Sequence, residues 1–203
     1  MSTSDDPANG AVLVVRHGET EWSASGRHTG RTDIALSDEG RRQAMLLRPR
    51  LAGRPFAAVL SSPLSRALET CRLAGLGDRA ELDDDLVEWD YGEFDGLTTE
   101  EIKKEHPGWW MWTDGYPGGE SVEQVTARVD RVISRCRSID GDVALFAHGH
   151  LLRVFAARWI DQPAALGASL ALSTAAISDL GWDREVPAIT GWNDVAHLRA
   201  AGR

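Results

Sequence analysis

The sequence predicts an α/β fold: a single domain with a mostly parallel central sheet and helices on both faces. Short apolar runs alternate along the chain with helix-like segments, which is the arrangement that builds parallel strands joined by helices. The length of 203 residues suits one domain with a full hydrophobic core. Neither an internal repeat nor a low-complexity linker divides the chain, so we expect one unit over residues 11–192.

Strands are expected where a short apolar run is bounded by turn residues. The first run, Ala11-Val12-Leu13-Val14-Val15, is uninterrupted, which is typical of a strand buried on both faces. In chain order, the expected strands are 11–15, 56–60, a short or extended piece at 80–87, 142–147, and a closing pair at 174–182 and 185–190.

Capping residues mark the starts of the expected helices. Ser37 precedes two acids, and Ser62-Pro63 joins an N-cap residue to a proline that suits the first helical position. Capping boxes begin at Thr98 and at Ser121. We expect helices from 37 to a kink or end near Pro49, from 62 to 74, from 98 to before Pro107, from 121 to 138 and from 150 to 160, with irregular chain at 16–36 and 107–120.

Composition and charge limit the partners. The net charge of −9 argues against a nucleic-acid-binding surface, so a phosphate site would have to be a local basic pocket. No apolar stretch has the length of a transmembrane helix, and residues 1–10 lack the pattern of a secretion signal. We therefore expect a cytoplasmic protein without nucleic-acid or membrane partners, a disordered tail at 1–10, a C-terminal tail at 193–203, and two buried free thiols, Cys71 and Cys136.

Groups suited to phosphate chemistry follow four of the apolar runs. A cation at the end of a buried strand is costly unless an anion binds there, and ligands of open α/β sheets bind at the carboxyl ends of the strands. Four such groups in order therefore predict a phosphate site. They are Arg16-His17-Gly18-Glu19-Thr20, Ser61-Ser62-Pro63-Leu64-Ser65-Arg66, Glu88-Trp89-Asp90-Tyr91-Gly92 and His148-Gly149-His150.

Transfer of a phosphoryl group needs a nucleophile, positive charge around the phosphoryl oxygens, and an acid for the leaving alkoxide. His17 can be the nucleophile if its ring is neutral and a backbone carbonyl in the Gly18 loop orients one ring nitrogen. Arg16 and Arg66 can clamp the phosphate oxygens, the latter from near a helix N-terminus.

Each group also has a plainer interpretation. His17 could be a core histidine that follows a strand, and Arg66 could be a solvated helical residue beside Glu69. Glu88 could be a surface acid among neighbouring aspartates. The pair His148 and His150 could bind a metal, although no Cys or Asp at ligand spacing accompanies it.

The four groups together resemble the histidine phosphatase superfamily, the phosphoglycerate-mutase-like enzymes, over roughly residues 12–182. The resemblance implies a phosphoglycerate-mutase-like fold and hydrolysis of a small phosphorylated metabolite through a phosphohistidine, with neither a cofactor nor a metal. It implies that His17 is the nucleophile, His148 the second catalytic histidine and Glu88 the proton donor. Arg16 and Arg66 complete the catalytic set. A homodimer is suggested by the family only.

The resemblance also implies a set of substrate-binding residues. Many family members carry Asn where this chain has Ser23, whose shorter side chain puts a direct phosphate contact in doubt. The Thr29-Gly30 segment matches a loop that approaches the phosphate in the family, but its plainer interpretation is a simple turn. The implied set is Arg16, Ser23, Thr29, Gly30, Arg66, Glu88, Tyr91, His148 and Gly149.

Residues 93–120 correspond to the place where the family inserts a lid. The aromatic cluster at 109–112 could pack on a substrate or could simply anchor an irregular loop. The cations of this segment are Lys103 and Lys104, which we expect a helix to present to water. Mutases of the superfamily hold a bisphosphorylated acid with more basic residues here, so hydrolysis is favoured over mutase activity.

Within the phosphatases, the motifs resemble two branches and do not choose between them. One contains actinobacterial acid phosphatases of broad specificity, and the other contains bisphosphatases that act on sedoheptulose bisphosphate. A catalytically inactive, phosphate-binding regulatory protein is the alternative from a different class. Such proteins lose the nucleophile, an arginine or the second histidine, and this chain keeps His17, Arg16, Arg66 and His148.

Overall fold

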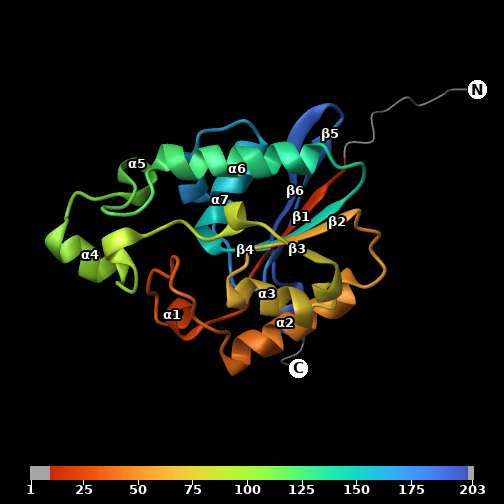
Figure 1. The fold of residues 1–203 in the computed structure, drawn as a ribbon, viewed down its shortest axis with the longest axis horizontal. Coiled ribbons are helices and arrows are strands. Elements are labelled where there is room, and N and C mark those ends of the chain that lie inside the picture. The colour runs from red at the N-terminus through yellow and green to blue at the C-terminus, as the bar shows by residue number, and fades with distance from the viewer. Residues whose placement is uncertain (1–9, 201–203) are drawn as a thin grey trace, which may run out of the picture.

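The computed structural model describes residues 10–200, so the expected N-terminal tail lies outside the described residues apart from Gly10. The core is a six-stranded sheet in the order β3-β2-β4-β1-β5-β6 (Figure 1). Strands β3, β2, β4 and β1 are parallel, whereas β5 runs antiparallel to β1 and β6 runs antiparallel to β5. The strands are β1 (Val12–Arg16), β2 (Ala58–Ser61), β3 (Ala80–Leu82), β4 (Val143–Ala147), β5 (Ile177–Asp183) and β6 (Val186–Asp194). The predicted fold class is confirmed.

Two apolar layers lie on opposite faces of the sheet because successive side chains of a strand point to opposite sides. On β1, Val12 and Val14 belong to one hydrophobic cluster, whereas Leu13 and Val15 belong to the other. The central strands β1 and β4 are therefore covered on both sides, which explains why their sequences are uninterrupted apolar runs.

Two pairs of helices cover the sheet. Helices α2 (Asp38–Leu51) and α3 (Ser65–Leu73) pack on one face, and α6 (Val122–Arg137) and α7 (Gly149–Trp159) pack on the other (Figure 1). Helices α4 (Thr99–Glu105) and α5 (Met111–Asp114) extend away from the sheet at one end of the molecule (Figure 1). The remaining helices are α1 (Glu21–Ala24) and α8 (Ala196–Ala200), with 3₁₀ turns η1 (Gly77–Arg79), η2 (Asp84–Leu86), η3 (Gly92–Phe94) and η4 (Ala164–Ser169).

Most of the predicted helix starts are confirmed, and one is wrong. Ser37 caps α2, and Thr98 and Ser121 form complete capping boxes at α4 and α6. The predicted cap at Ser62 fails, because α3 begins at Ser65 after an N-cap residue, Leu64, without a side-chain cap. The Ser62 hydroxyl is instead turned to the functional site described below.

Some other boundaries agree with the prediction and others differ. Helix α2 includes Pro49 and ends two residues later at Leu51, which agrees with the expected end near Pro49. Residues 16–36 contain the short helix α1, and residues 107–120 contain α5. From residue 193 onward, where a tail was expected, the chain completes β6 and forms α8, and Asp194 pairs with Arg50 of α2 at 2.6 Å. Within residues 10–200, no helix has both the length and the apolar character that crossing a bilayer requires.

Candidate active site

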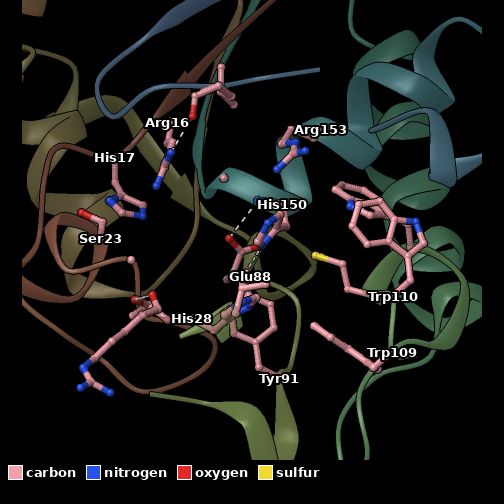
Figure 2. A pocket seen from close by; sticks show the side chains of 18 of the residues that line it. Arg16, His17, Ser23, His28, Glu88, Tyr91, Trp109, Trp110, His150 and Arg153 are labelled. Atoms are coloured by element: carbon pink, nitrogen blue, oxygen red, sulfur yellow. Dashed lines mark hydrogen bonds between the residues drawn. The ribbon is translucent and has the colours of Figure 1, made fainter. Parts of the chain in front are cut away.

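The predicted phosphate-binding groups meet at the carboxyl ends of the parallel strands. Arg16 ends β1 and His17 follows it, His148 follows β4, and Arg66 lies in the first turn of α3 after β2. The ring centroids of His17 and His148 are 5.2 Å apart. A cavity of about 350 Å³ opens beside them (Figure 2). Its lining includes Arg16, His17, Ser23, Thr29, Glu88, Tyr91 and Gly149, but not the predicted residues Gly30, Arg66 and His148.

The hydrogen bonding of His17 leaves one ring nitrogen open. Nδ1 lies 2.7 Å from the carbonyl oxygen of Gly18, which can only accept, so Nδ1 carries the proton and Nε2 holds the lone pair. Burial lowers the pKa of His17 well below 6.5, and the charges of Arg66 and Arg16 lower it further. The ring is therefore neutral, as a nucleophile must be. Gly18 is required here, because a Cβ would lie 2.4 Å from the carbonyl oxygen of Gly40.

His148 is held at both ring nitrogens. Nε of Arg66 donates to its Nδ1 at 3.1 Å, so the proton of the neutral ring is on Nε2, which donates to Oγ of Ser62 at 2.8 Å. Burial lowers the pKa of His148 well below its usual 6.5, with Arg66 the next cause. Ser62 is fully buried and is a residue that sequence reasoning assigned to a helix cap. Its position directly after β2 is the signal that could have found it.

Arg66 is oriented by backbone carbonyl groups. Its guanidinium donates to the carbonyl oxygens of Thr32, Thr29 and Gly30 at 3.0, 3.2 and 2.8 Å. The nearest paired acid, Asp33, is 3.9 Å away and about half exposed. Thr29 and Gly30 thus contact Arg66 through their backbone, which explains why this loop belongs to the site. Its charge is left largely available for an anion.

Arg16 is a buried cation with unused hydrogen-bonding capacity. Its Nη1 donates to the carbonyl oxygen of Leu172 at 2.5 Å, but its buried Nε has no partner in the described part of the chain. Burial lowers the pKa of Arg16. A Cβ on Gly149 would lie 3.2 Å from Cζ of Arg16, so the glycine lets the guanidinium lie against α7. An orphaned buried donor on a cation indicates a site built for an anion.

Glu88 is fixed at the N-terminus of α7. Its Oε1 accepts the backbone N–H groups of Trp89 and Leu151 at 2.9 and 2.8 Å, and its Oε2 accepts that of His150 at 3.0 Å. Oε2 accepts a single N–H, so one of its lone pairs has no partner among these three bonds. Figure 2 shows Glu88 between Arg16 and Tyr91 at the centre of the cavity.

The segment that carries Glu88 is held from behind by Arg128 of α6. The guanidinium of Arg128 donates to the carbonyl oxygens of Asp85, Val87 and Glu88 at 2.8, 2.7 and 3.0 Å. It also pairs with Glu120 at 2.7 Å, and both side chains are largely buried. Nothing in the sequence pattern distinguishes Arg128 from the solvated arginines of α6, so sequence reasoning missed it.

Ser23 and Tyr91 have their own protein partners. Oγ of Ser23 accepts the backbone N–H of Thr20 at 2.9 Å and donates to the carbonyl oxygen of Thr20 at 3.0 Å, so this hydroxyl caps α1 while it faces the cavity. The hydroxyl of Tyr91 hydrogen-bonds to Nδ1 of His150. Burial raises the pKa of Tyr91 well above 10, so it stays a neutral phenol.

The tryptophans at 109–112 support both of the interpretations that the sequence left open. Trp109 donates its indole N–H to the carbonyl oxygen of Gly115 at 2.9 Å, and Trp112 is buried against Trp89, so these two anchor the segment. Trp110 is 47% exposed and lines the cavity. His28 and Arg153 also line it and were missed. Arg153 lies on α7, five residues after His148, a separation that does not place the two on one face of a helix, so no local pattern marks it.

The metal interpretation of His148 and His150 has no geometric support. The ring nitrogens of His148 face Arg66 and Ser62, and Nδ1 of His150 faces Tyr91. A guanidinium donor at Nδ1 of His148 occupies the lone pair that a metal would need. Over residues 10–200, no three His, Cys, Asp or Glu side chains gather as a metal site would require.

Comparison with known proteins assigns the chain to a family of phosphatases. The model of the histidine phosphatase superfamily (branch 1) matches residues 12–195, so the chain belongs to this superfamily. An acid phosphatase of Mycobacterium tuberculosis is 42% identical over 88% of this chain and 89% of its own length. The sedoheptulose 1,7-bisphosphatase of Saccharomyces cerevisiae is 37% identical over 72% of this chain and 66% of its own length.

Solved structures agree with this assignment. The product of a Mycobacterium tuberculosis open reading frame has a TM-score of 0.86 and 39% identity, over 91% of this chain and 97% of its own. A mycobacterial glucosyl-3-phosphoglycerate phosphatase has a TM-score of 0.79 and 30% identity, over 91% and 98%. The protein is therefore a histidine phosphatase with a phosphoglycerate-mutase-like fold, a hydrolase of phosphoric monoesters that is homologous to an acid phosphatase.

Proposed function

We propose that the protein hydrolyses phosphomonoesters of small metabolites through a covalent phosphohistidine at His17. One observation carries this: Nδ1 of His17 is bound to the Gly18 carbonyl oxygen, so Nε2 presents its lone pair to a cavity bordered by cations. Burial and two arginines keep the ring neutral. His148 is also neutral and lies beside Arg66, but both of its ring nitrogens are hydrogen-bonded, whereas the hydrogen bonds of the described residues leave Nε2 of His17 free.

In the first step, Nε2 of His17 attacks phosphorus and the bond from phosphorus to the leaving oxygen breaks. The leaving oxygen takes a proton from Oε2 of Glu88, which ends the step as a carboxylate. Arg16, Arg66 and His148 stabilise the negative charge on the phosphoryl oxygens. The products of this step are the alcohol and the phosphohistidine.

In the second step, water attacks the phosphohistidine. Glu88 accepts a proton from the water, the P–N bond breaks, and its electron pair returns to Nε2 of His17. Inorganic phosphate leaves, and Glu88 again holds the proton that it needs for the next turnover. The cycle balances without a metal or a cofactor.

Hydrolysis is favoured over mutase activity by the segment 93–120. Of its two lysines, Lys104 is exposed and pairs with Glu100 at 3.2 Å, as expected for a residue presented to water. Lys103 is also exposed, but its ammonium lies over the ring of Trp110 at the edge of the cavity. Relatives that are 37% and 42% identical are named phosphatases, and others that are 29% identical are named probable phosphoglycerate mutases, so the more similar relatives support hydrolysis of small phosphorylated metabolites.

The test of this function measures phosphate release and the covalent intermediate together. Wild-type protein should release phosphate from p-nitrophenyl phosphate, and quenching during turnover should trap an acid-labile phosphohistidine. His17→Ala should remove both while keeping the circular dichroism of the wild type. Turnover by His17→Ala would overturn the assignment. Rapid primer-dependent conversion of 3-phosphoglycerate to 2-phosphoglycerate would instead support a mutase.

A second experiment isolates the role of Glu88. Glu88→Gln keeps the shape of the side chain but cannot donate the proton, so activity on an alkyl phosphate should fall by roughly 10²–10⁴-fold. The loss should be much smaller with p-nitrophenyl phosphate, whose leaving group needs little protonation. Equal losses on both substrates would mean that Glu88 positions other groups and is not the acid.

A further inference from the structure

The part of the cavity farther from His17 is basic and aromatic. We call it the distal half and define it by Thr99, Lys103, Trp109, Trp110, Met111, Trp112 and Arg153. Of the described residues that line the whole cavity, Glu88 alone is acidic, whereas Arg16, Arg27, Lys103 and Arg153 are basic. The whole chain has a net charge of −9, so the cavity wall is positively charged in a protein that is negatively charged overall.

Arg153 is a partly buried cation held by neutral groups. Its Nε donates to the carbonyl oxygen of Gly167 at 2.9 Å, and its Nη2 donates to that of Ala168 at 3.1 Å. Its guanidinium carbon lies 4.7 Å from the ring centroid of Trp112. These contacts fix the guanidinium beside the cavity (Figure 2) but do not neutralise its charge. Burial is the main cause that lowers its pKa, which shows the cost of this placement.

Lys103 brings a second cation to the distal half from a different element. Its ammonium lies 5.9 Å from the ring centroid of Trp110, the tryptophan that is largely exposed. The neighbouring Lys104 instead pairs with Glu100 along α4 and does not line the cavity. Adjacent lysines of one helix thus have different surroundings, and the one at the cavity is the one without an acid.

The two distal cations have similar surroundings, which Arg137 shares outside this cavity, where it lies over the rings of Trp159 and Trp182. Arg153 and Lys103 each lie on a tryptophan ring, and the ion pairs found within residues 10–200 include neither of them. An aromatic ring fixes a cation while leaving its charge uncompensated. Such a charge at the wall of a cavity is available to pair with an anion that enters the cavity.

We propose that the distal half is a second anion subsite, and that the preferred substrates are phosphomonoesters that carry a second anionic group, either a phosphate or a carboxylate. Arg153 is its main contact and Lys103 its second. Arg153 lies five residues beyond His148 on α7, which corresponds to about 7.5 Å along the helix axis. The second anion is therefore separated from the reacting phosphoryl group by a short linker. This inference rests on the proposed phosphatase activity.

The test compares substrates that differ by one anionic group. Fructose 1,6-bisphosphate is paired with fructose 6-phosphate for a second phosphate, and 3-phosphoglycerate is paired with glycerol 3-phosphate for a carboxylate. The wild type should show a ratio of kcat/KM of about ten or more in favour of the doubly anionic substrate in at least one pair. The pair with the larger ratio identifies which anion the subsite takes. The ratio should fall as ionic strength rises.

Variants that each remove one positive charge then show which residues produce the preference in kcat/KM for the doubly anionic substrate. Arg153→Gln should reduce it about tenfold, mainly through a higher KM for the doubly anionic substrate, which is the effect of losing one charged hydrogen bond. Lys103→Gln should reduce it by a smaller factor. Lys104→Gln is the control for Lys103, and Arg158→Gln is the control for Arg153, because Arg158 lies on the same helix and pairs with Asp130 outside the cavity. Both controls change the net charge equally and should leave the ratio unchanged.

The outcomes separate this inference from the proposed function. If the wild type hydrolyses none of the phosphomonoesters, including p-nitrophenyl phosphate, both fail. If it hydrolyses both members of each pair equally well, or if Lys104→Gln lowers the ratio as much as Lys103→Gln, the anion subsite is refuted and the phosphatase stands. Since Arg153→Gln also removes two contacts with η4, Arg153→Lys serves as the check on folding: it keeps the charge and should retain most of the preference.

Discussion

The hydroxyl of Ser62 lies 2.8 Å from Nε2 of His148, and both groups are fully buried. In the free protein, Arg66 donates to Nδ1, so Nε2 of His148 carries the proton. To donate from Nδ1 to a phosphoryl oxygen, the ring must adopt the other tautomer, and Nε2 must then accept a hydrogen bond. A serine hydroxyl can reverse its role in this way because it is both donor and acceptor.

Ser62→Ala is therefore expected to lower kcat about tenfold while KM changes by less than about twofold, since it leaves a buried ring nitrogen of His148 unpaired. Steady-state kinetics with p-nitrophenyl phosphate measure both constants. Ser61→Ala is the matched control, because that hydroxyl is also buried but bonds to the carbonyl oxygen of Ser62 at 3.0 Å. Equal effects of the two variants would mean that Ser62 acts through packing alone.

Gly149→Ala should disturb Arg16 without changing any charge. The added Cβ would lie 3.2 Å from Cζ of Arg16, so the guanidinium must shift by a few tenths of an ångström. We expect kcat/KM to fall about tenfold, the effect of one weakened charged hydrogen bond. Gly108→Ala is the control, because a Cβ there meets no atom within 4 Å. Unchanged kinetics in Gly149→Ala would show that Arg16 tolerates the shift.

Arg128→Met should destabilise the protein strongly. It removes the donor for three carbonyl groups before and at Glu88, and it leaves Glu120 largely buried without its cation. Breaking such a buried pair costs about 3–5 kcal/mol, which denaturant unfolding can measure. Arg131→Gln on the same helix breaks an exposed pair with Asp85, for which a much smaller loss is expected because solvent screens the pair. Similar losses in both variants would contradict the structural role of Arg128.

Stability should fall as the pH falls from about 6.5 to about 4. Burial lowers the pKa of His28 from 6.5 to about 4, so the unfolded chain binds a proton in this range and the folded chain does not. Its stabilising contribution is complete above pH 6.5 and is lost as the pH approaches 4, which corresponds to about 3 kcal/mol. Unfolding in denaturant at several pH values measures this. His28→Gln should flatten the dependence; an equally steep one in that variant would exclude His28 as a cause.

Burial also lowers the pKa values of His17 and His148, so a similar pH dependence is expected for activity. The pKa of His17 lies well below 6.5, so the neutral nucleophile persists into acidic solution. Activity should therefore continue at pH values at which a free histidine would be protonated, and its decline on the acidic side should report the coupled pair of His17 and His148.

Much of the fold and of the reaction centre was predictable from the sequence because local patterns decide them. The apolar run before Arg16 predicts a buried strand, and parallel strands place their carboxyl ends at one edge, so Arg16, His17 and His148 meet there. The position of Arg66 follows from the helix after β2. These arguments use only local periodicity and the geometry of parallel sheets.

The remaining features depend on contacts between distant parts of the chain. Arg128 reaches carbonyl groups about forty residues earlier, and the partner of Ser62 is 86 residues later. The cap predicted at Ser62 was wrong because that tertiary contact outweighs a local preference. Arg153 was missed since its pattern fits an ordinary surface arginine of an amphipathic helix. Neighbours in space, not in sequence, give these residues their roles.

The unpartnered Nε of Arg16 also has a consequence for the stability of the protein in solution. Burial disfavours the charged guanidinium groups of Arg16 and Arg66, so an anion that fills the site contributes to the folded state as a structural element. Inorganic phosphate at a hundred times its dissociation constant would add about 2.7 kcal/mol to the stability. Melting temperatures measured in phosphate and in an anion-poor buffer should therefore differ. The anion content of the buffer would therefore contribute to the melting temperature that is measured for this protein.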